Sequence, residues 1–317
     1  MTGLAPLPGN DAGALAEALR LCETIASRNR SDLYRVSQLL RDRRRYEAFL
    51  ATYAVMREID DFVDAVPDVT NLAPEELPRL EGELKRWRDR IAAAASASPG
   101  PEPLDIALAA ALASFPVSFS IWETYLEAMR YDLRHDRFET WESFLAYAEG
   151  AAAAPTATFL FLLCAQPVKG ESARNVRYRV AEVDDGFDYL ACGRELGFFA
   201  YLVHVLRDVR KDLQTGARGR IYLPASELAK AGLPEEEFRR LVLSGAADGR
   251  WSNLVLSVVN RARAFERAGV ARARARLPAM EPDCRLILER IVGVYRDLLD
   301  KIEADPASVL QAQAAGE

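Results

Sequence analysis

An all-α fold is predicted for this chain by the period of its apolar residues and by the absence of strand patterns. Apolar residues recur at three- and four-residue steps along most of the 317 positions, as in amphipathic helices. No segment alternates apolar and polar residues in the way of a strand, and no strand-like run leads into Gly-x-Gly-x-x-Gly. With 50% hydrophobic residues the chain can bury a large core. We expect a soluble helical bundle formed by one domain, 1–317, with flexible ends at 1–10 and 304–317.

The net charge and the cysteines narrow the class of protein. A net charge of −6 and a pI near 5.3 argue against a nucleic-acid partner, which would select a basic surface. The four cysteines are far apart and lack Cys-x-x-Cys spacing, so we expect reduced thiols and a cytoplasmic location. The first residues lack the basic and apolar segments of a secretory signal.

The N-terminal part is expected to form helices that lead to a first charged motif. Residues 11–28 have helical spacing of leucines and alanines, and Ser31 is suited to cap the helix SDLYRVSQLL. The run RDRRR at 41–45 predicts a solvated helix start, because charge runs usually face water.

The first motif is YAVMREIDDFVDAV, which places charged side chains on one helical face. Tyr53, Arg57, Asp60 and Asp64 follow at four-, three- and four-residue steps, with Asp61 beside them. Burying an unpaired carboxylate is costly, so this face predicts a cation that meets the two aspartates.

The middle of the chain contains a break and two apolar segments. After proline breaks, residues 75–96 predict an exposed, charge-rich helix, and SASPGPEP at 96–103 predicts a flexible connector within the same domain. Residues 120–134 carry a mostly aromatic stripe that is typical of core packing. The uncharged stretch 150–168 approaches the length of a membrane span, but Pro155 and the alanines favour a buried core helix. Its small residues can leave room for an apolar cavity or allow close helix packing.

Two further acidic segments follow. EVDDGFD at 182–188 spells Asp-Asp-x-x-Asp, yet its glycine and its lack of an apolar stripe predict an acidic loop without metal. The second motif is a helix in which Gly197, Tyr201, His204, Asp208 and Asp212 share one face.

The loop after the second motif and the helices beyond it complete the pattern. Residues 216–220 contain glycines and Arg220, which can close over an anionic ligand. Long helices are expected at 248–278 and 283–303.

The two aspartate motifs together predict a metal site. If their helices face one another, the anions repel until divalent cations enter, and magnesium shared with substrate phosphates fits this best. The aspartates and arginines of these motifs therefore predict a site for a polyphosphate that is bridged by metal ions.

Through REIDDFVD at 57–64, LRDVRKD at 206–212 and GRIYLP at 219–224, the chain resembles the squalene/phytoene synthase family over roughly 30–302. The resemblance implies an isoprenoid synthase-type bundle with a central cavity. It also implies two prenyl diphosphate substrates, joined head to head through a cyclopropylcarbinyl diphosphate with Mg2+ as cofactor. The metal ligands that it implies are Asp60, Asp64, Asp208 and Asp212. The substrate-binding residues that we expect are Tyr53, Arg57, Arg207, Tyr201, Arg220 and Ser31, of which Ser31 is equally explained as a helix cap.

Three departures from the family are visible. Tyr201 and His204 stand where the family has Gln and Asn, and Phe265 stands where it has a tyrosine. We include His204 among the catalytic residues with Tyr53, Arg57 and the four aspartates. Asp208 one turn away favours its protonated form, which would bind diphosphate; a neutral ring could remove a proton from a carbocation.

Three functions follow from these observations. The leading one is a magnesium-dependent prenyltransferase that releases diphosphate. An alternative is a class I terpene cyclase that acts on one prenyl diphosphate, which the three departures favour. A third is a non-catalytic assembly protein of the same fold, against which the four aspartates argue. Peripheral membrane association, for release of an apolar product, is a further expectation.

Overall fold

The computed structural model confirms the all-α fold and describes residues 3–7, 11–28, 31–170, 176–180, 187–215 and 219–311. The α-helices, in chain order, are α1 (Ala12–Ser27), α2 (Asp32–Ser37), α3 (Arg43–Asp64), α4 (Glu76–Ala95), α5 (Pro103–Ser114), α6 (Phe119–Asp132), α7 (Trp141–Ala148), α8 (Ala154–Cys164), α9 (Tyr189–Asp212), α10 (Ala225–Lys230), α11 (Glu235–Ser244), α12 (Gly249–Arg276) and α13 (Pro282–Ala304). The short elements are the π-helical turn η1 (Glu149–Ala153), the 3-10 turns η2 (Leu277–Ala279) and η3 (Ser308–Leu310), and the antiparallel strands β1 (Gln166–Pro167) and β2 (Tyr178–Arg179).

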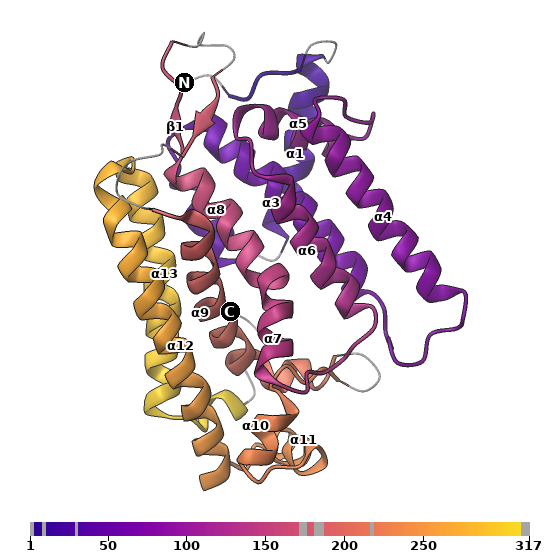
Figure 1. Cartoon of the computed structure of the whole chain (residues 1–317), viewed down its shortest axis with the longest axis vertical. Coiled ribbons are helices and arrows are strands. Elements are labelled where there is room, and N and C mark those ends of the chain that lie inside the picture. Colours follow the sequence, from indigo (N-terminus) through magenta and orange to yellow (C-terminus); the bar gives the residue numbers. More distant parts are fainter. Residues whose placement is uncertain are drawn as a thin grey trace.

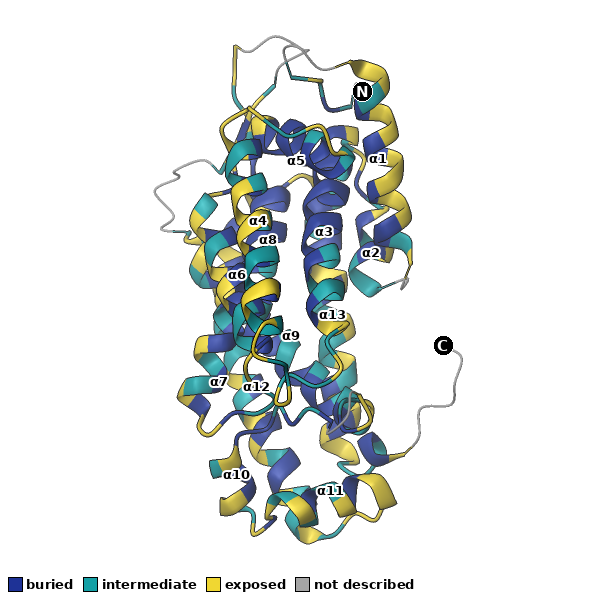
Figure 2. Ribbon diagram, turned by 90° about the vertical axis from the view of Figure 1, so that its right-hand side faces the viewer, coloured by how far each residue is buried: buried dark blue, intermediate teal, exposed yellow. Residues whose placement is uncertain are grey.

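The helices α8 and α9 form the centre of the bundle. Figure 1 shows them between the N-terminal helices on one side and α12 with α13 on the other. Helix α9 packs against α8 and α12, while α3 packs against α1, α5 and α8. The burial pattern follows this layering, because the inner faces of these helices are buried and the outer faces are exposed (Figure 2). Helices α10 and α11 cover one end of the bundle.

The apolar stretch after Trp141 is a core helix. The continuous helical run Trp141–Cys164 is long and apolar enough to cross a membrane, but 78% of its apolar window is buried inside the fold. A helix that is apolar all round belongs in the interior of a large domain. The sequence-based expectation of a buried helix is therefore confirmed for this stretch.

Small residues let the central helices approach closely. A Cβ added at Gly197 of α9 would lie 2.8 Å from the carbonyl oxygen of Ala152, and one at Gly193 would lie 2.7 Å from the Cα of Ala157. In contrast, Ala151 lines a cavity. Both predicted uses of the small residues are present, each at different positions.

The described parts of both ends, 3–7 and 305–311, pack against the bundle; the expectation of flexibility over 1–10 and 304–317 as a whole stays a prediction. The backbone N–H of Leu4 donates to Glu47 Oε2 at 2.6 Å, and the Leu4 side chain is buried. At the other end Val309 and Leu310 are buried, and Arg210 donates to the Leu310 carbonyl at 2.7 Å. Apolar side chains within each tail explain this packing, because burying them offsets the ordering of a few residues.

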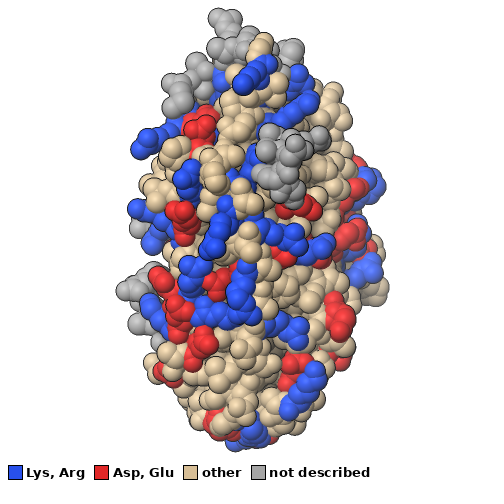
Figure 3. Space-filling view, turned by 60° about the vertical axis from the view of Figure 1, so that its left-hand side comes forward, with Lys and Arg blue, Asp and Glu red and all other residues tan. Residues whose placement is uncertain are grey.

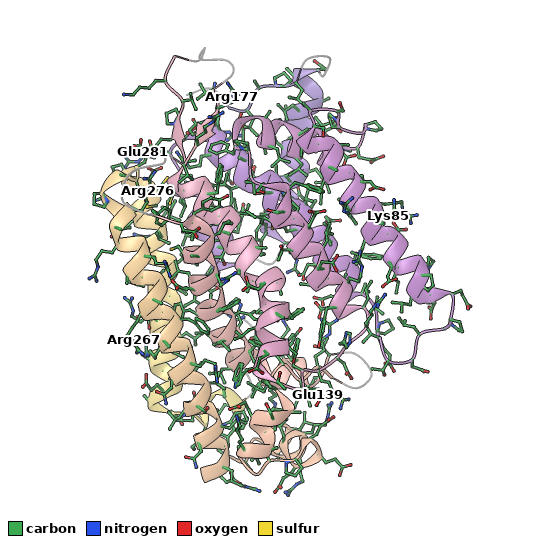
Figure 4. The ribbon with its side chains drawn as sticks, in the orientation of Figure 1. Lys85, Glu139, Arg177, Arg267, Arg276 and Glu281 are labelled. Carbon is green, nitrogen blue, oxygen red and sulfur yellow. The ribbon has the colours of Figure 1, made fainter. Side chains whose placement is uncertain are left out.

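The RDRRR run starts a helix as predicted and is solvated at Arg41 and Arg43, but Arg44 and Arg45 are buried, contrary to the sequence-based expectation. Arg45 is 1% exposed and donates to the carbonyls of Leu162 and Ala165, the latter at 3.0 Å. Its guanidinium also lies 5.3 Å from the centroid of the Tyr178 ring. Arg44, the residue before Arg45, and Arg276 at the end of α12 are also buried, and Figure 4 shows Arg276 near Glu281. Arg45 thus binds the carbonyls that the end of α8 leaves unpaired.

The Arg-rich helix α12 does not present a purely basic surface. Arg263 is paired with Glu266 at 3.0 Å and Glu303 at 2.7 Å, and Arg272 is paired with Glu195 at 2.7 Å. Figure 3 shows Lys and Arg side chains interspersed with Asp and Glu over one face of the molecule. The absence of a nucleic-acid partner remains a prediction that this mixed face supports.

Candidate active site

The first aspartate motif lies at the C-terminal end of α3. Arg57 Nη1 is 3.2 Å from Asp60 Oδ2, and Arg57 Nη2 is 2.5 Å from Asp61 Oδ1. Burial, with the neighbouring Asp64 as the next cause, raises the pKa of Asp60 to about 6. Helix C-termini already carry partial negative charge, so carboxylates there are doubly unfavourable without a cation.

The second motif repeats this arrangement at the C-terminal end of α9. Arg207 binds the neighbouring Asp208 through two hydrogen bonds, Nε to Oδ1 at 2.8 Å and Nη2 to Oδ2 at 2.6 Å. Burial raises the pKa of Asp212 to about 7, with Asp208 as the next cause. In each motif an arginine binds one aspartate closely, Asp61 or Asp208, and burial raises the pKa of another, Asp60 or Asp212.

Arg220 connects the two motifs. Its backbone N–H donates to the Asp212 carbonyl at 2.8 Å, while its Nη1 donates to Asp64 Oδ1 at 3.0 Å. Gly219 precedes it with a φ of +70°, and a Cβ there would clash with the Leu213 backbone. Of the predicted anion-binding loop, residues 216–218 lie outside the described part of the chain. The glycine turn brings Arg220 to Asp64, whereas closure of the loop over an anionic ligand stays a prediction.

Behind Arg220 lies a buried polar network that the sequence reasoning missed. Asp132 of α6 accepts a hydrogen bond from the Tyr147 hydroxyl at 2.8 Å, and Tyr201 lies with its hydroxyl 3.5 Å from that of Tyr147. Arg220 Nη1 also donates to the Tyr222 hydroxyl at 3.3 Å. The signal available in the sequence was Asp132, a carboxylate within the mostly aromatic stripe at 120–134. A carboxylate on a buried helix face requires hydrogen-bond or ion-pair partners.

An apolar cavity of about 170 Å³ opens next to the first motif. Tyr53, Arg57 and Asp60 form its polar end. Arg57 Nε is buried there and has no protein partner among the described residues, so an anionic ligand could accept its hydrogen bond. The remaining lining residues are Leu33, Phe49, Thr52, Met56, Tyr125, Ala151, Pro155, Thr158, Phe159 and Leu162.

A second apolar cavity, of about 110 Å³, lies between α8, α9 and α13. It shares Leu33, Pro155 and Phe159 with the first cavity, so these three side chains form the wall between them. Tyr295 of α13 lines the second cavity and also faces His204, with ring centroids 5.0 Å apart.

Ser31 and Tyr53 are in contact at the N-terminus of α2. Ser31 Oγ accepts a hydrogen bond from the Tyr34 N–H at 3.2 Å, so the capping interpretation is correct. The same oxygen lies 3.0 Å from the Tyr53 hydroxyl. Ser31 therefore also positions a tyrosine that lines the first cavity.

His204 favours the neutral one of the two forms that the sequence leaves open. Burial, with the guanidinium of Arg207 as the next cause, lowers its pKa to about 4 and outweighs the opposing effect of Asp208. Asp208 raises the pKa of His204 less because Arg207 is paired with Asp208. The ring is neutral at neutral pH and packs against Tyr295.

The acidic loop at 182–188 lies mostly outside the described residues. Its last residue, Asp188, caps α9 by accepting hydrogen bonds from Leu190 N–H at 2.8 Å and Ala191 N–H at 3.1 Å. The expectation that this segment does not bind metal stays a prediction, because 182–186 lie outside the described residues.

The residues present fit a divalent cation that is shared with a ligand. The described side chains form no group of three or more His, Cys, Asp or Glu ready to enclose a metal ion. The pKa values of Asp60 and Asp212, at two helix C-termini, stay raised even though Arg57, Lys211 and Arg220 compensate part of their charge. This donor set suits Mg2+, which keeps several waters and is completed by substrate phosphates rather than by an all-protein cage.

Comparison with known proteins agrees with these features. The sequence profile described as squalene/phytoene synthase matches residues 26–315. The chain is 28% identical to a chloroplastic phytoene synthase of an Oncidium hybrid cultivar, over 92% of this chain and 62% of that protein. It is 27% identical to the 15-cis-phytoene synthase of Synechococcus elongatus, over 97% of this chain and 91% of that one. The chain spans less than two thirds of the length of the chloroplastic relative.

The fold is shared with a solved dehydrosqualene synthase in complex with ligand. The TM-score is 0.72 at 19% identity, and the match covers 96% of this chain and 93% of that chain. The match confirms the predicted isoprenoid synthase-type bundle.

Proposed function

This chain belongs to the squalene/phytoene synthase family, and on that basis we propose that it is a magnesium-dependent prenyltransferase that condenses two prenyl diphosphates head to head. The observation that carries the proposal is the apolar cavity whose polar end is formed by Arg57 and Asp60, at the point where Arg220 joins both aspartate motifs. Diphosphate leaves one substrate with the electron pair of its C–O bond. The double bond of the second substrate forms the new C–C bond, and closure of the cyclopropane ring releases a proton.

Different side chains would act on the diphosphate and on the hydrocarbon part of the substrates. Asp60, Asp64, Asp208 and Asp212 would hold magnesium, which acts as a Lewis acid toward the leaving diphosphate. Arg57 and Arg207 are placed to bind diphosphate oxygens, since each has donors at the ends of the motif helices. Once diphosphate leaves, the apolar walls exclude water from the allylic cation.

The two cavities are suited to hold two prenyl chains. Both are lined almost entirely by apolar or aromatic side chains, and they share one wall. Such lining is typical of sites for apolar ligands with one polar end.

The terpene cyclase alternative loses its support in the structure. Tyr201, His204 and Phe265 favoured it, but none of them is among the described residues that line either cavity. Tyr201 stacks on Phe144 with centroids 5.7 Å apart, and Phe265 packs edge-on against Phe198 at 5.1 Å. These departures change the packing around the site rather than its lining.

Incubation of the purified protein with Mg2+ and C10, C15 and C20 prenyl diphosphates, singly and in pairs, tests the proposal. We expect diphosphate release together with a product that contains two prenyl units, and loss of both after treatment with EDTA. A monocyclic or polycyclic product of a single unit would instead establish a cyclase. Absence of turnover with every substrate, while the protein stays folded, would contradict the enzymatic proposal.

A further inference from the structure

Arg220 lies between two carboxylates of very different exposure. Its Nη1 is 3.0 Å from Asp64 Oδ1 and 4.0 Å from Asp132 Oδ1. The Asp64 side chain is 50% exposed, whereas that of Asp132 is 8% exposed. Asp64 is therefore accessible to a hydrated cation from solvent, and Asp132 is not.

Asp132 is held where it is by the surrounding fold. Its second oxygen accepts the Tyr147 hydroxyl at 2.8 Å, so Oδ1 is the atom directed at Arg220. A buried carboxylate is costly unless a cation and hydrogen bonds meet it. Arg220 opposes the effect of burial on the pKa of Asp132, so a closer guanidinium favours the charged carboxylate.

Arg220 can exchange between these partners without moving its backbone. The N–H of Arg220 is bonded to the Asp212 carbonyl at 2.8 Å, and Ile221 N–H is bonded to the Asp136 carbonyl at 3.2 Å. The guanidinium is the free end of a long side chain, and the two carboxylates differ by 1 Å in distance from one of its nitrogens. A small rotation of the side chain is sufficient to change the preferred partner.

We propose that Asp132 is a positioning residue: it is the buried carboxylate that retains the Arg220 guanidinium when a divalent cation takes Asp64. The inference rests on the proposed function, because it requires that Asp64 bind a metal. Without Asp132, the ion pair of Arg220 with Asp64 has no competitor, so the guanidinium competes with the metal. With Asp132, the guanidinium stays in the site as a positive charge next to the metal-bound diphosphate.

The test is a double-mutant cycle on cation binding, with no turnover involved. Mn2+ binding is measured from the EPR signal of the free ion, at pH 8 and in the presence of inorganic diphosphate. The proteins are the wild type, Asp132→Asn, Arg220→Gln and the double variant. We expect Asp132→Asn to weaken Mn2+ binding roughly tenfold, a coupling of the size seen for groups in contact, and to change it less than about twofold in the Arg220→Gln background.

A general electrostatic effect predicts a different result. Removing any nearby carboxylate weakens cation binding. A general effect of this kind would weaken Mn2+ binding equally in the wild type and in the Arg220→Gln variant, and such additivity would overturn the proposal. A purely structural role is separated by Asp105→Asn. Asp105 is also buried and pairs with Arg90 at 2.7 Å, on the helix α5 that packs mainly against α1, α3 and α4. That variant should lower the unfolding midpoint and leave Mn2+ binding unchanged.

A measurement on the wild type covers the case in which Asp132→Asn does not fold. The Nε–H signal of Arg220 in a 15N-arginine NMR spectrum, assigned with Arg220→Gln, should shift on addition of Mg2+ and diphosphate yet remain protected from solvent exchange. Loss of protection would show that the guanidinium is released to solvent and would overturn the inference. Wild-type protein that binds no Mn2+ would refute the metal site of the proposed function and the inference together, whereas normal binding with an additive cycle refutes the inference alone.

Discussion

At the scale of single residues, Asp60 and Asp208 are the most direct test of the site. Each is changed to Asn, which removes a negative charge at almost constant size. We expect diphosphate release to fall by roughly 100-fold or more, the scale for losing one group that stabilises developing charge. The measurement is kcat for diphosphate release, with circular dichroism to confirm the fold.

Asp89 provides the matched control for these substitutions. It lies on the exposed face of α4 and pairs with Lys85 at 2.7 Å, and Figure 4 shows Lys85 on that outer helix. Asp89→Asn should keep wild-type activity. Full activity of Asp60→Asn and Asp208→Asn would refute the site assignment.

His204 gives a prediction about protonation. Its folded pKa of about 4 lies below the usual value of 6.5, so the unfolded chain binds more protons between these two pH values. The contribution of His204 to stability therefore falls as the pH falls through this window and is unaffected above it. The raised pKa values of Asp60 and Asp212 act in the opposite direction in the same pH range, so the effect of His204 is read from the difference between wild type and variant. In the 13C-histidine NMR spectrum the His204 ring should still be neutral at pH 5.

The comparison variant is His204→Asn, which assigns the signal and should remove the contribution of His204 to the pH dependence of urea unfolding between pH 6.5 and 4. A His204 ring that titrates near 6.5 or above would contradict the neutral assignment. It would also restore a charged role toward diphosphate.

The sequence could identify the site residues that lie close together on a single helix. Asp60 with Asp64, and Asp208 with Asp212, are four residues apart on one helix, so spacing alone places each pair on one face. Asp132 and Tyr147 escaped notice as site residues because their hydrogen bond joins different helices. The neutral state of His204 depends on its burial, which its own helix does not reveal.

At the scale of secondary-structure elements, the end of α8 depends on Arg45. Its guanidinium donates to the carbonyls of Leu162 and Ala165. Arg45→Met removes these donors and leaves buried carbonyl oxygens unpaired, each at a cost of about 1–3 kcal/mol. We expect the free energy of unfolding in urea to fall by roughly 2–4 kcal/mol, within that range for two groups.

Arg43→Met is the control within the same charge run. The Arg43 side chain is 55% exposed and pairs with Glu47 at 2.6 Å. Glu47 is 7% exposed but keeps the hydrogen bond from the Leu4 N–H, and the Arg43 end of the pair is solvated, so this variant should lose less stability than Arg45→Met. Equal losses in the two variants would contradict the capping role of Arg45.

The elements themselves were predictable from apolar periodicity, and their surroundings were not. The helices at 11–28, 75–96 and 283–303 lie within a few residues of α1, α4 and α13. The helix start within the RDRRR run was predictable but the burial of Arg45 was not, because local charge says nothing of the carbonyls at the end of α8 that Arg45 binds. The burial of Leu310 was not predictable for the same reason, since its carbonyl is bound by Arg210 of α9, which is distant in sequence.

At the scale of the whole molecule, the cavities result from packing between distant parts of the chain. The first is bounded by α3 and α8, and the second by α8, α9 and α13. The existence of a central cavity was implied by family resemblance, whereas its division into two was not. The division depends on the side chains that face both spaces.

Phe159 of α8 is the largest side chain in that shared wall. Its ring packs edge-on against Phe49, with centroids 5.7 Å apart, and it lines both cavities. Phe159→Leu removes ring volume from the wall, so the two spaces should join. We expect the ratio of product from C20 to product from C15 diphosphate to rise several-fold, because a longer chain gains room and apolar contact. The ratio is measured by competition between the two substrates in one reaction.

Phe161→Leu is matched to this variant in residue type, helix and burial. Phe159 is 7% exposed and Phe161 is 6% exposed, but Phe161 packs against Tyr189 at 5.5 Å and lines neither cavity. Both substitutions remove similar core volume and should lower stability to a similar extent. Only Phe159→Leu should change the product ratio. A ratio that shifts equally in both variants would show that chain length responds to general loosening of α8, and the partition by Phe159 would then be wrong.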